Sequence, residues 1–113
     1  MKRETTPDTC PAAPALRAIA GRWKTHIIYL LGEEGPVRFN AIQRRLAPVS
    51  PKVLTSRLRE LAKDDLVWRE QEETIPPKVT YGLTDLGREV HEVLKSFDAV
   101  GRKFDSVAPE EKS

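Results

Sequence analysis

The 113-residue chain lacks several features on which whole classes of protein depend. Its single cysteine, Cys10, excludes an internal disulfide. Its two histidines, His26 and His91, lie far apart with no cysteine or carboxylate at ligand spacing, so we expect no metal site. The longest apolar run, Ile27 to Leu31, is much shorter than the ~18 residues that span a bilayer, and no membrane segment is predicted.

The chain also has little that would support catalysis or secretion. It contains no glycine-rich phosphate loop, no evident pair of nucleophile and base, and no acidic dyad in a plausible cleft. No apolar stretch follows the basic start at Lys2 and Arg3, so a signal peptide is not expected. We therefore expect a single small domain that is cytoplasmic, is not an enzyme and carries no cofactor.

The charges are distributed unevenly, although the net charge is only +2. Residues 36–63 carry seven Lys or Arg against Glu60 alone, whereas residues 64–113 carry seven against twelve Asp or Glu. A basic block within an otherwise acidic chain is typical of a protein that binds a polyanion. A solvated charged face without a partner is the alternative.

The first half of the chain predicts small helices around one apolar helix. Residues 1–12 are interpreted as a flexible arm, and 23–31 are apolar on nearly all sides, which predicts a buried helix. Asn40 and Gln43 have the spacing of a capping box at a helix start. The remaining elements expected in this half are a helix over 14–20, a very short strand over 37–39 and a helix over 40–46.

The most clearly defined helix begins at Ser50, a good N-cap, and extends to Lys63. Pro51 occupies the first helical position, where its missing N–H costs nothing. Three leucines at i, i+4 and i+7 form one inward stripe: Leu54, Leu58 and Leu61. The opposite side is polar and basic, and it carries Lys52, Thr55, Ser56, Arg59 and Lys63.

The second half predicts a β-hairpin followed by one long helix. Strands are expected over 66–70 and 78–83, and a helix capped by Thr84 over about 84–107. That helix has more apolar side chains than a small core can absorb, so we expect a dimer face along it, to which the family resemblance given below adds the first helix. The residues predicted there are Leu16, Ile19, Val90, Val93, Leu94, Phe97, Val100 and Phe104.

The order of these elements predicts a fold that is mainly α with a small β-hairpin. It is a winged helix-turn-helix over 13–107, flanked by N- and C-terminal dimerisation helices, with 108–113 as a disordered tail. In this architecture the second helix of the pair enters the major groove, and its N-terminal half reaches the base edges. The basic block coincides with that pair of helices. A winged-helix protein-interaction module without DNA binding is the alternative function.

An ordered set of motifs across residues 10–100 resembles the HxlR-type family of bacterial transcriptional regulators. The matching runs include Ile19-x-Gly21-Arg22-Trp23-Lys24, Arg38-Phe39-x-x-Ile42, Leu54-Thr55-x-x-Leu58-Arg59-Glu60-Leu61 and Pro76-Pro77-Lys78-Val79. The resemblance implies a homodimer on double-stranded operator DNA that regulates nearby genes and often responds to oxidants or electrophiles. Asp65 stands where the family usually has glycine, so the helix must end there on a residue that tolerates the left-handed conformation.

Individual side chains are assigned to DNA contacts on this basis. Arg59 and Lys52 are expected at or near base edges, with a phosphate contact as the alternative for each. The short donors Ser50, Thr55 and Ser56 suit phosphate or base contacts, although Ser50 is equally explained as a helix cap. Three further cations are assigned to the DNA backbone: Arg38, Lys24 and, on the hairpin, Lys78.

Cys10 is the candidate sensor, because the resemblance places it at the N-terminal cysteine that some relatives oxidise or alkylate. As the sole thiol of the chain, it can form a disulfide only with another subunit or a small thiol. The alternative is a small hydrophobic side chain buried at the dimer interface. A regulator with these properties is expected in the cytoplasm, at the nucleoid.

Overall fold

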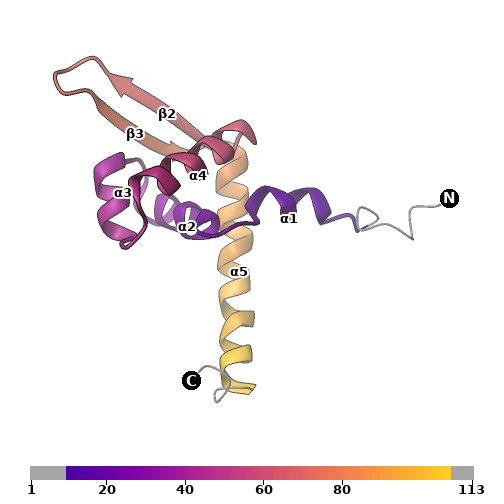
Figure 1. Ribbon diagram of the computed structural model, residues 1–113. Coiled ribbons are helices and arrows are strands. Elements are labelled where there is room, and N and C mark those ends of the chain that lie inside the picture. The colour runs from indigo at the N-terminus through magenta and orange to yellow at the C-terminus, as the bar shows by residue number, and fades with distance from the viewer. Residues whose placement is uncertain (1–9, 108–113) are drawn as a thin grey trace.

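The computed structural model describes residues 10–107; the terminal segments interpreted as the outer part of the arm and as the tail lie outside the described residues. The chain forms five helices and three strands over this range. In order they are α1 (Ala13–Ile19), α2 (Lys24–Glu34), β1 (Val37–Arg38), α3 (Phe39–Arg45), α4 (Pro51–Lys63), β2 (Val67–Glu72), β3 (Lys78–Leu83) and α5 (Asp85–Val107). Figure 1 shows a body built from α2, α3, α4 and the hairpin, with α1 and α5 projecting from it.

Helix α2 is the centre of the body, as its apolar sequence predicted. Ile27 and Ile28 are completely buried and Leu31 almost so. The helix extends beyond the predicted range of 23–31, through Gly32 to Glu34, and Gly35 is its C-cap. Gly32 lies inside the helix because the ring of His91, from α5, packs closely against its backbone.

Helices α3 and α4 form the helix-turn-helix. Helix α3 begins at Phe39 and its N-cap, Arg38, makes no side-chain capping bond, so the capping box predicted from Asn40 and Gln43 is wrong. The start of α4 is confirmed: the Ser50 hydroxyl accepts a hydrogen bond of 3.1 Å from the Val53 amide, and Pro51 is the first helical residue.

The strands form an antiparallel sheet in the order β1-β3-β2. Strand β1 pairs with β3 through Val37 opposite Tyr81 and Arg38 opposite Thr80. This third strand ties the start of α3 to the hairpin β2–β3, which we call the wing (residues 67–83). The wing therefore has a fixed position relative to the helix-turn-helix.

Helix α5 begins where the wing returns to the body. The Thr84 hydroxyl accepts a hydrogen bond of 3.0 Å from the Gly87 amide and donates one of 2.6 Å to the Asp65 carbonyl. Asp65 adopts φ 63°, the left-handed conformation required where it replaces glycine. The first part of α5 packs against α2. The remainder of this 23-residue helix extends away from the body (Figure 1).

Within residues 10–107, none of the helices combines the length and the apolar character that a membrane crossing needs.

Candidate nucleic-acid interface

The outward side of α4, which we call the contact face, consists of Lys52, Thr55, Ser56, Arg59 and Lys63. It exists because Leu54, Leu58 and Leu61 are buried on the opposite side of the helix. Lys52, Arg59 and Lys63 are exposed, while Thr55 and Ser56 are half-buried beside them. The helix thus presents cations and short hydroxyl donors to solvent, with no bulky apolar side chain between them.

A basic cleft of about 1010 Å³ separates the contact face from the wing. Leu58, Val79 and Tyr81 contribute apolar lining, and Thr55 lines the side formed by α4. Five cations from three parts of the chain converge on it: Arg38, Arg44, Arg59, Arg69 and Lys78. The structure therefore brings together four predicted DNA-binding residues from three separate segments of the chain: Arg38, Thr55, Arg59 and Lys78. Lys52, Ser50 and Ser56 lie on or next to the same helix but do not line the cleft.

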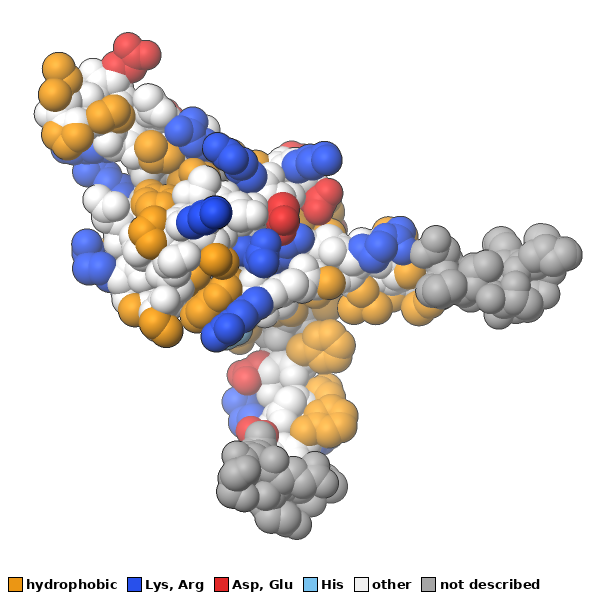
Figure 2. Space-filling view, in the orientation of Figure 1, with side chains coloured by type: hydrophobic (Ala, Val, Ile, Leu, Met, Phe, Trp, Pro, Cys, Tyr) orange, Lys and Arg blue, Asp and Glu red, His pale blue; other side chains and the backbone are white. Residues whose placement is uncertain are grey.

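Figure 2 shows Lys and Arg side chains spread over the body, while hydrophobic side chains line the projecting helix below it. Several of the basic side chains are already engaged within the protein. Arg45 pairs with Glu34 through both terminal nitrogens of its guanidinium group, and Arg57 pairs with Glu60 at 3.3 Å. The basic block therefore offers fewer free cations to a ligand than its composition suggests.

Lys24 is the predicted DNA contact that the structure does not support. It is only 7% exposed, and its ammonium group forms an ion pair of 3.2 Å with Glu60 of α4. This pairing lowers the pKa of Glu60, chiefly through the hydrogen bond from Lys24, with Arg57 adding to it. The assignment failed because the sequence shows that Lys24 starts a helix but not that this helix start packs against α4.

The wing carries negative charge toward its tip. Glu70, Glu72 and Glu73 are exposed, and Glu72 approaches Arg38 at 3.9 Å. Arg69, which faces the cleft, donates a hydrogen bond of 2.8 Å to the Gln71 side chain. The Arg38–Glu72 contact was not predicted from the sequence; it arises because β1 and β2 lie on the two sides of β3, which no local pattern indicates.

The predicted dimer residues fall into two groups. Val93, Phe97 and Phe104 are 60%, 55% and 70% exposed, and together with Val100 they form one stripe along α5, which we call the apolar stripe. Leu16 of α1 is also half exposed. In contrast, Leu94 belongs to the buried core of the protomer, and Ile19 and Val90 pack against that core. The assignment of Leu94 to the interface is wrong, because its side of α5 faces α2.

Cys10 is exposed at the turn that precedes α1, and its carbonyl accepts a hydrogen bond of 2.9 Å from the Ala13 amide. Among residues 10–107, no group of three or more His, Cys, Asp or Glu side chains is placed to hold a metal ion. The buried His91 instead contacts Glu33, with 2.9 Å between Nε2 and the carboxylate.

A model of the HxlR-like helix-turn-helix family matches residues 18–108. The chain belongs to the HxlR-like helix-turn-helix family. An HTH-type transcriptional regulator of Halalkalibacterium halodurans, BH0655, is 45% identical over 75 residues, or 66% of each chain. YdeP, an HTH-type transcriptional regulator of Bacillus subtilis, is 36% identical over 95 residues, which cover 84% of this chain and 73% of YdeP.

Solved structures agree with this assignment and confirm the winged helix-turn-helix. The reduced form of the redox regulator HypR superposes with a TM-score of 0.81 at 33% identity, covering 88% of this chain and 98% of HypR. Reduced YodB, a transcriptional regulator of B. subtilis, gives a TM-score of 0.71 at 31% identity, covering 84% and 94% of the two chains. The family match and these relatives together show that the chain is a helix-turn-helix transcriptional regulator.

Proposed function

We propose that this HxlR-like regulator binds operator DNA as a homodimer, with α4 of each protomer in the major groove. The observation that carries the proposal is the position of the exposed contact face directly beside the basic cleft. A major groove is about 12 Å wide and admits a helix whose outward side chains are polar. The adjacent cleft then suits the phosphate backbone that borders the groove.

Within this arrangement the contact residues take distinct roles. Arg59 and Lys52 project from the contact face toward base edges, and Ser50, Thr55 and Ser56 donate to bases or nearby phosphates. Arg38 and Lys78 line the cleft and contact the backbone. The acidic charge on the wing implies that the wing flanks the duplex through Lys78 and does not enter the minor groove. The protein acts at the nucleoid, in the cytoplasm.

The test is in vitro selection of duplexes from a random pool, followed by footprinting and affinity measurements at several salt concentrations. A specific duplex should emerge, and its log affinity should fall with log salt by about 0.9 for each phosphate contacted. Selection of no duplex, or an affinity insensitive to salt, would contradict DNA binding.

The homodimer is supported by the apolar stripe. A soluble monomer rarely leaves several large apolar side chains exposed along one helix, and burying each fully is worth about 1.5–3 kcal/mol. A second copy that packs along this stripe covers it and provides the twofold symmetry typical of operators. Sedimentation equilibrium tests this directly, and a mass equal to one protomer at micromolar concentration would contradict it.

Cys10 is proposed as a site that responds to oxidants or electrophiles. Its exposure leaves the thiol accessible, and two of the similar structures are of the redox regulator HypR in its reduced form and of YodB treated with diamide. Two Cys10 thiols, or Cys10 and a small thiol, would lose two protons and two electrons to an oxidant such as diamide and form a disulfide. Thiol-specific mass spectrometry with and without diamide tests this, with Cys10→Ser as the control. An unmodified thiol and an unchanged DNA affinity would contradict it.

A protein-interaction module is the second candidate function, and the acidic wing is the observation that favours it. An acidic surface next to DNA weakens attraction to phosphate, whereas it suits a basic protein partner. The two functions differ in their response to salt. Retention of a protein partner at high salt, with no affinity for any duplex at low salt, would favour the interaction module.

A further inference from the structure

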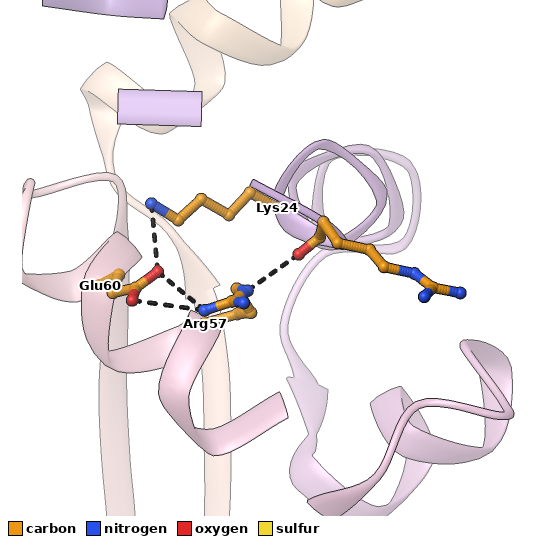
Figure 3. Close-up of polar contacts among 4 residues, drawn as sticks. Lys24, Arg57 and Glu60 are labelled. Carbon is orange, nitrogen blue, oxygen red and sulfur yellow. Dashed lines mark hydrogen bonds and ion pairs between the residues drawn. The ribbon is translucent and has the colours of Figure 1, made fainter. Parts of the chain in front are cut away.

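Three charged side chains connect the start of α2 to the flank of α4. The Lys24 ammonium lies 3.2 Å from Glu60 Oε1, and Arg57 Nη1 lies 3.3 Å from both oxygens of the same carboxylate. Arg57 also donates from Nε to the backbone carbonyl of Arg22, at 3.0 Å. Figure 3 shows the Lys24 ammonium group above the Glu60 carboxylate and the Arg57 guanidinium group beside it, both joined to it by dashed lines. We call Lys24, Arg57 and Glu60 the charged clamp.

The charged clamp does not belong to the contact face. Lys24 is buried, and the guanidinium group of Arg57 is directed to Glu60 and to the Arg22 carbonyl. Its members therefore hold α4 from the side that faces α2. Hydrogen bonds between charged groups add geometric specificity, so they oppose rotation of α4 about its axis in addition to the packing of its leucines.

The backbone around Arg22, to which Arg57 bonds, has an uncommon conformation. Gly21 and Trp23 both adopt positive φ, 112° and 81°, at the corner between α1 and α2. The Arg22 carbonyl that accepts from Arg57 lies between them. Helix α4 is thus bonded to the corner from which α1 leaves the body.

We propose that Lys24, Arg57 and Glu60 are positioning residues, which fix the orientation of the α4 contact face relative to the α1–α2 corner without touching DNA. This inference rests on the proposed function, since it concerns how the contact face is aimed at the duplex. Removing the Glu60 carboxylate leaves the buried ammonium group of Lys24 without its counter-charge. Removing the Lys24 ammonium leaves the Glu60 carboxylate paired with Arg57 alone.

The test uses Lys24→Met and Glu60→Gln, because the two substitutions change the net charge in opposite directions. If these residues act only through long-range charge, Lys24→Met weakens binding to every duplex and Glu60→Gln strengthens it. If they position α4, both weaken binding to the selected duplex, by roughly tenfold, relative to a random duplex of the same length. Glu60→Gln keeps an oxygen that accepts from Lys24, so it preserves the fold if Lys24→Met does not.

Two further measurements distinguish a positioning role from a direct contact with DNA. The salt dependence should be unchanged in Lys24→Met, whereas loss of a true phosphate contact lowers the slope by about 0.9. The variant that carries both Lys24→Met and Glu60→Gln should bind the selected duplex no more weakly than the single variant with the lower affinity, because the two residues act as one unit. Glu92→Gln, which removes the same charge from an exposed pair with Lys95 on α5, is the matched control and should leave the preference for the selected duplex unchanged.

The outcomes distinguish the two claims. If the wild-type chain selects no duplex, the proposed function fails and the positioning role fails with it. If the wild type selects a duplex and Glu60→Gln binds it as well as or better than wild type, the positioning role alone is overturned. Additive losses in the double variant, or a shallower salt slope in Lys24→Met, overturn it as well.

Discussion

The imidazole ring of His91 occupies the space that a side chain at position 32 would need. A Cβ atom on Gly32 would lie 2.3 Å from the ring, far inside van der Waals contact. The ring also contacts Tyr29 edge-on, with centroids 5.3 Å apart, and bonds to Glu33 on the exposed side. One turn of α2 therefore forms the surface against which His91 of α5 packs.

Gly32→Ala should destabilise the protein, because its methyl group can be accommodated only if the buried His91 ring leaves its place or α5 moves away from α2. We expect a loss of about 1–3 kcal/mol in the free energy of unfolding, as for other overpacked sites. Gly101→Ala is the matched control: it is also a helical glycine, but its Cβ would meet nothing within 4 Å. That change should leave stability equal or higher by about 0.5–1 kcal/mol. Urea unfolding of both variants checks this, and equal midpoints would contradict it.

Arg59→Ala should weaken binding to the selected duplex and relax the base preference at one position in each half-site. An arginine that bonds a guanine edge through both nitrogens contributes about 1–3 kcal/mol of discrimination. Arg102→Ala, on the side of α5 away from the apolar stripe, provides the same substitution outside the contact face. Repeating the selection with each variant measures the effect. If the Arg59 variant retains the wild-type footprint and preference, α4 is oriented differently from the way proposed.

Glu72→Gln should strengthen binding to all duplexes, since Glu72 partly neutralises Arg38 in the free protein. Both side chains are about half exposed, so the pair is worth at most about 1 kcal/mol and the gain should be less than about fivefold. Glu73→Gln removes the same charge from the same wing without releasing Arg38. Fluorescence anisotropy with a random duplex compares the two variants. An equal gain in both would show that only the net charge of the wing matters.

Phe97→Asp should shift the proposed dimer toward monomer. Phe97 is in the middle of the apolar stripe, and a charge there would have to be desolvated in both copies. Lys95→Asp, from the opposite side of α5, should leave the assembly unchanged. Sedimentation equilibrium over a range of concentrations measures both. A wild-type dimer that tolerates Phe97→Asp would place the interface elsewhere.

The ion pair at Glu60 predicts how stability depends on pH. Its pKa in the folded protein is below the ordinary value of 4.5, because Lys24 and then Arg57 favour the carboxylate. The folded state thus gains stability that is fully present above the ordinary pKa and is lost as the pH falls through the lowered one. Wild type should be more stable than Glu60→Gln at pH 7, and this difference should disappear in acid below 4.5. Urea melts across this range check it, and a difference that persists at the lowest pH would contradict it.

The sequence predicted the elements that depend on local signals. The start of α4 follows from Ser50 and Pro51, and the bare side of α5 from the spacing of Val93, Phe97 and Phe104. Local spacing did not reveal contacts between distant segments. Lys24 has the same appearance in the sequence as a free surface cation, and only the packing of α2 against α4 shows that Glu60 neutralises it.

The same limit explains the two assignments on α5 and α3 that failed. Leu94 has the helical spacing of the apolar stripe, but it lies at the edge that α2 covers, and this edge depends on where the two helices cross. The pattern of Asn40 and Gln43 was sufficient for a capping box, yet pairing of β1 with β3 allows the helix to begin at Phe39.

The projecting part of α5 has a mechanical consequence. In the proposed dimer, the bodies that carry the two α4 helices are joined largely through these long α5 helices. A small change in the angle at which the two α5 helices cross would therefore change the distance between the two α4 helices by a much larger amount. In that dimer, the spacing of the two DNA half-sites is set where the α5 helices cross, far from any residue proposed to touch a base.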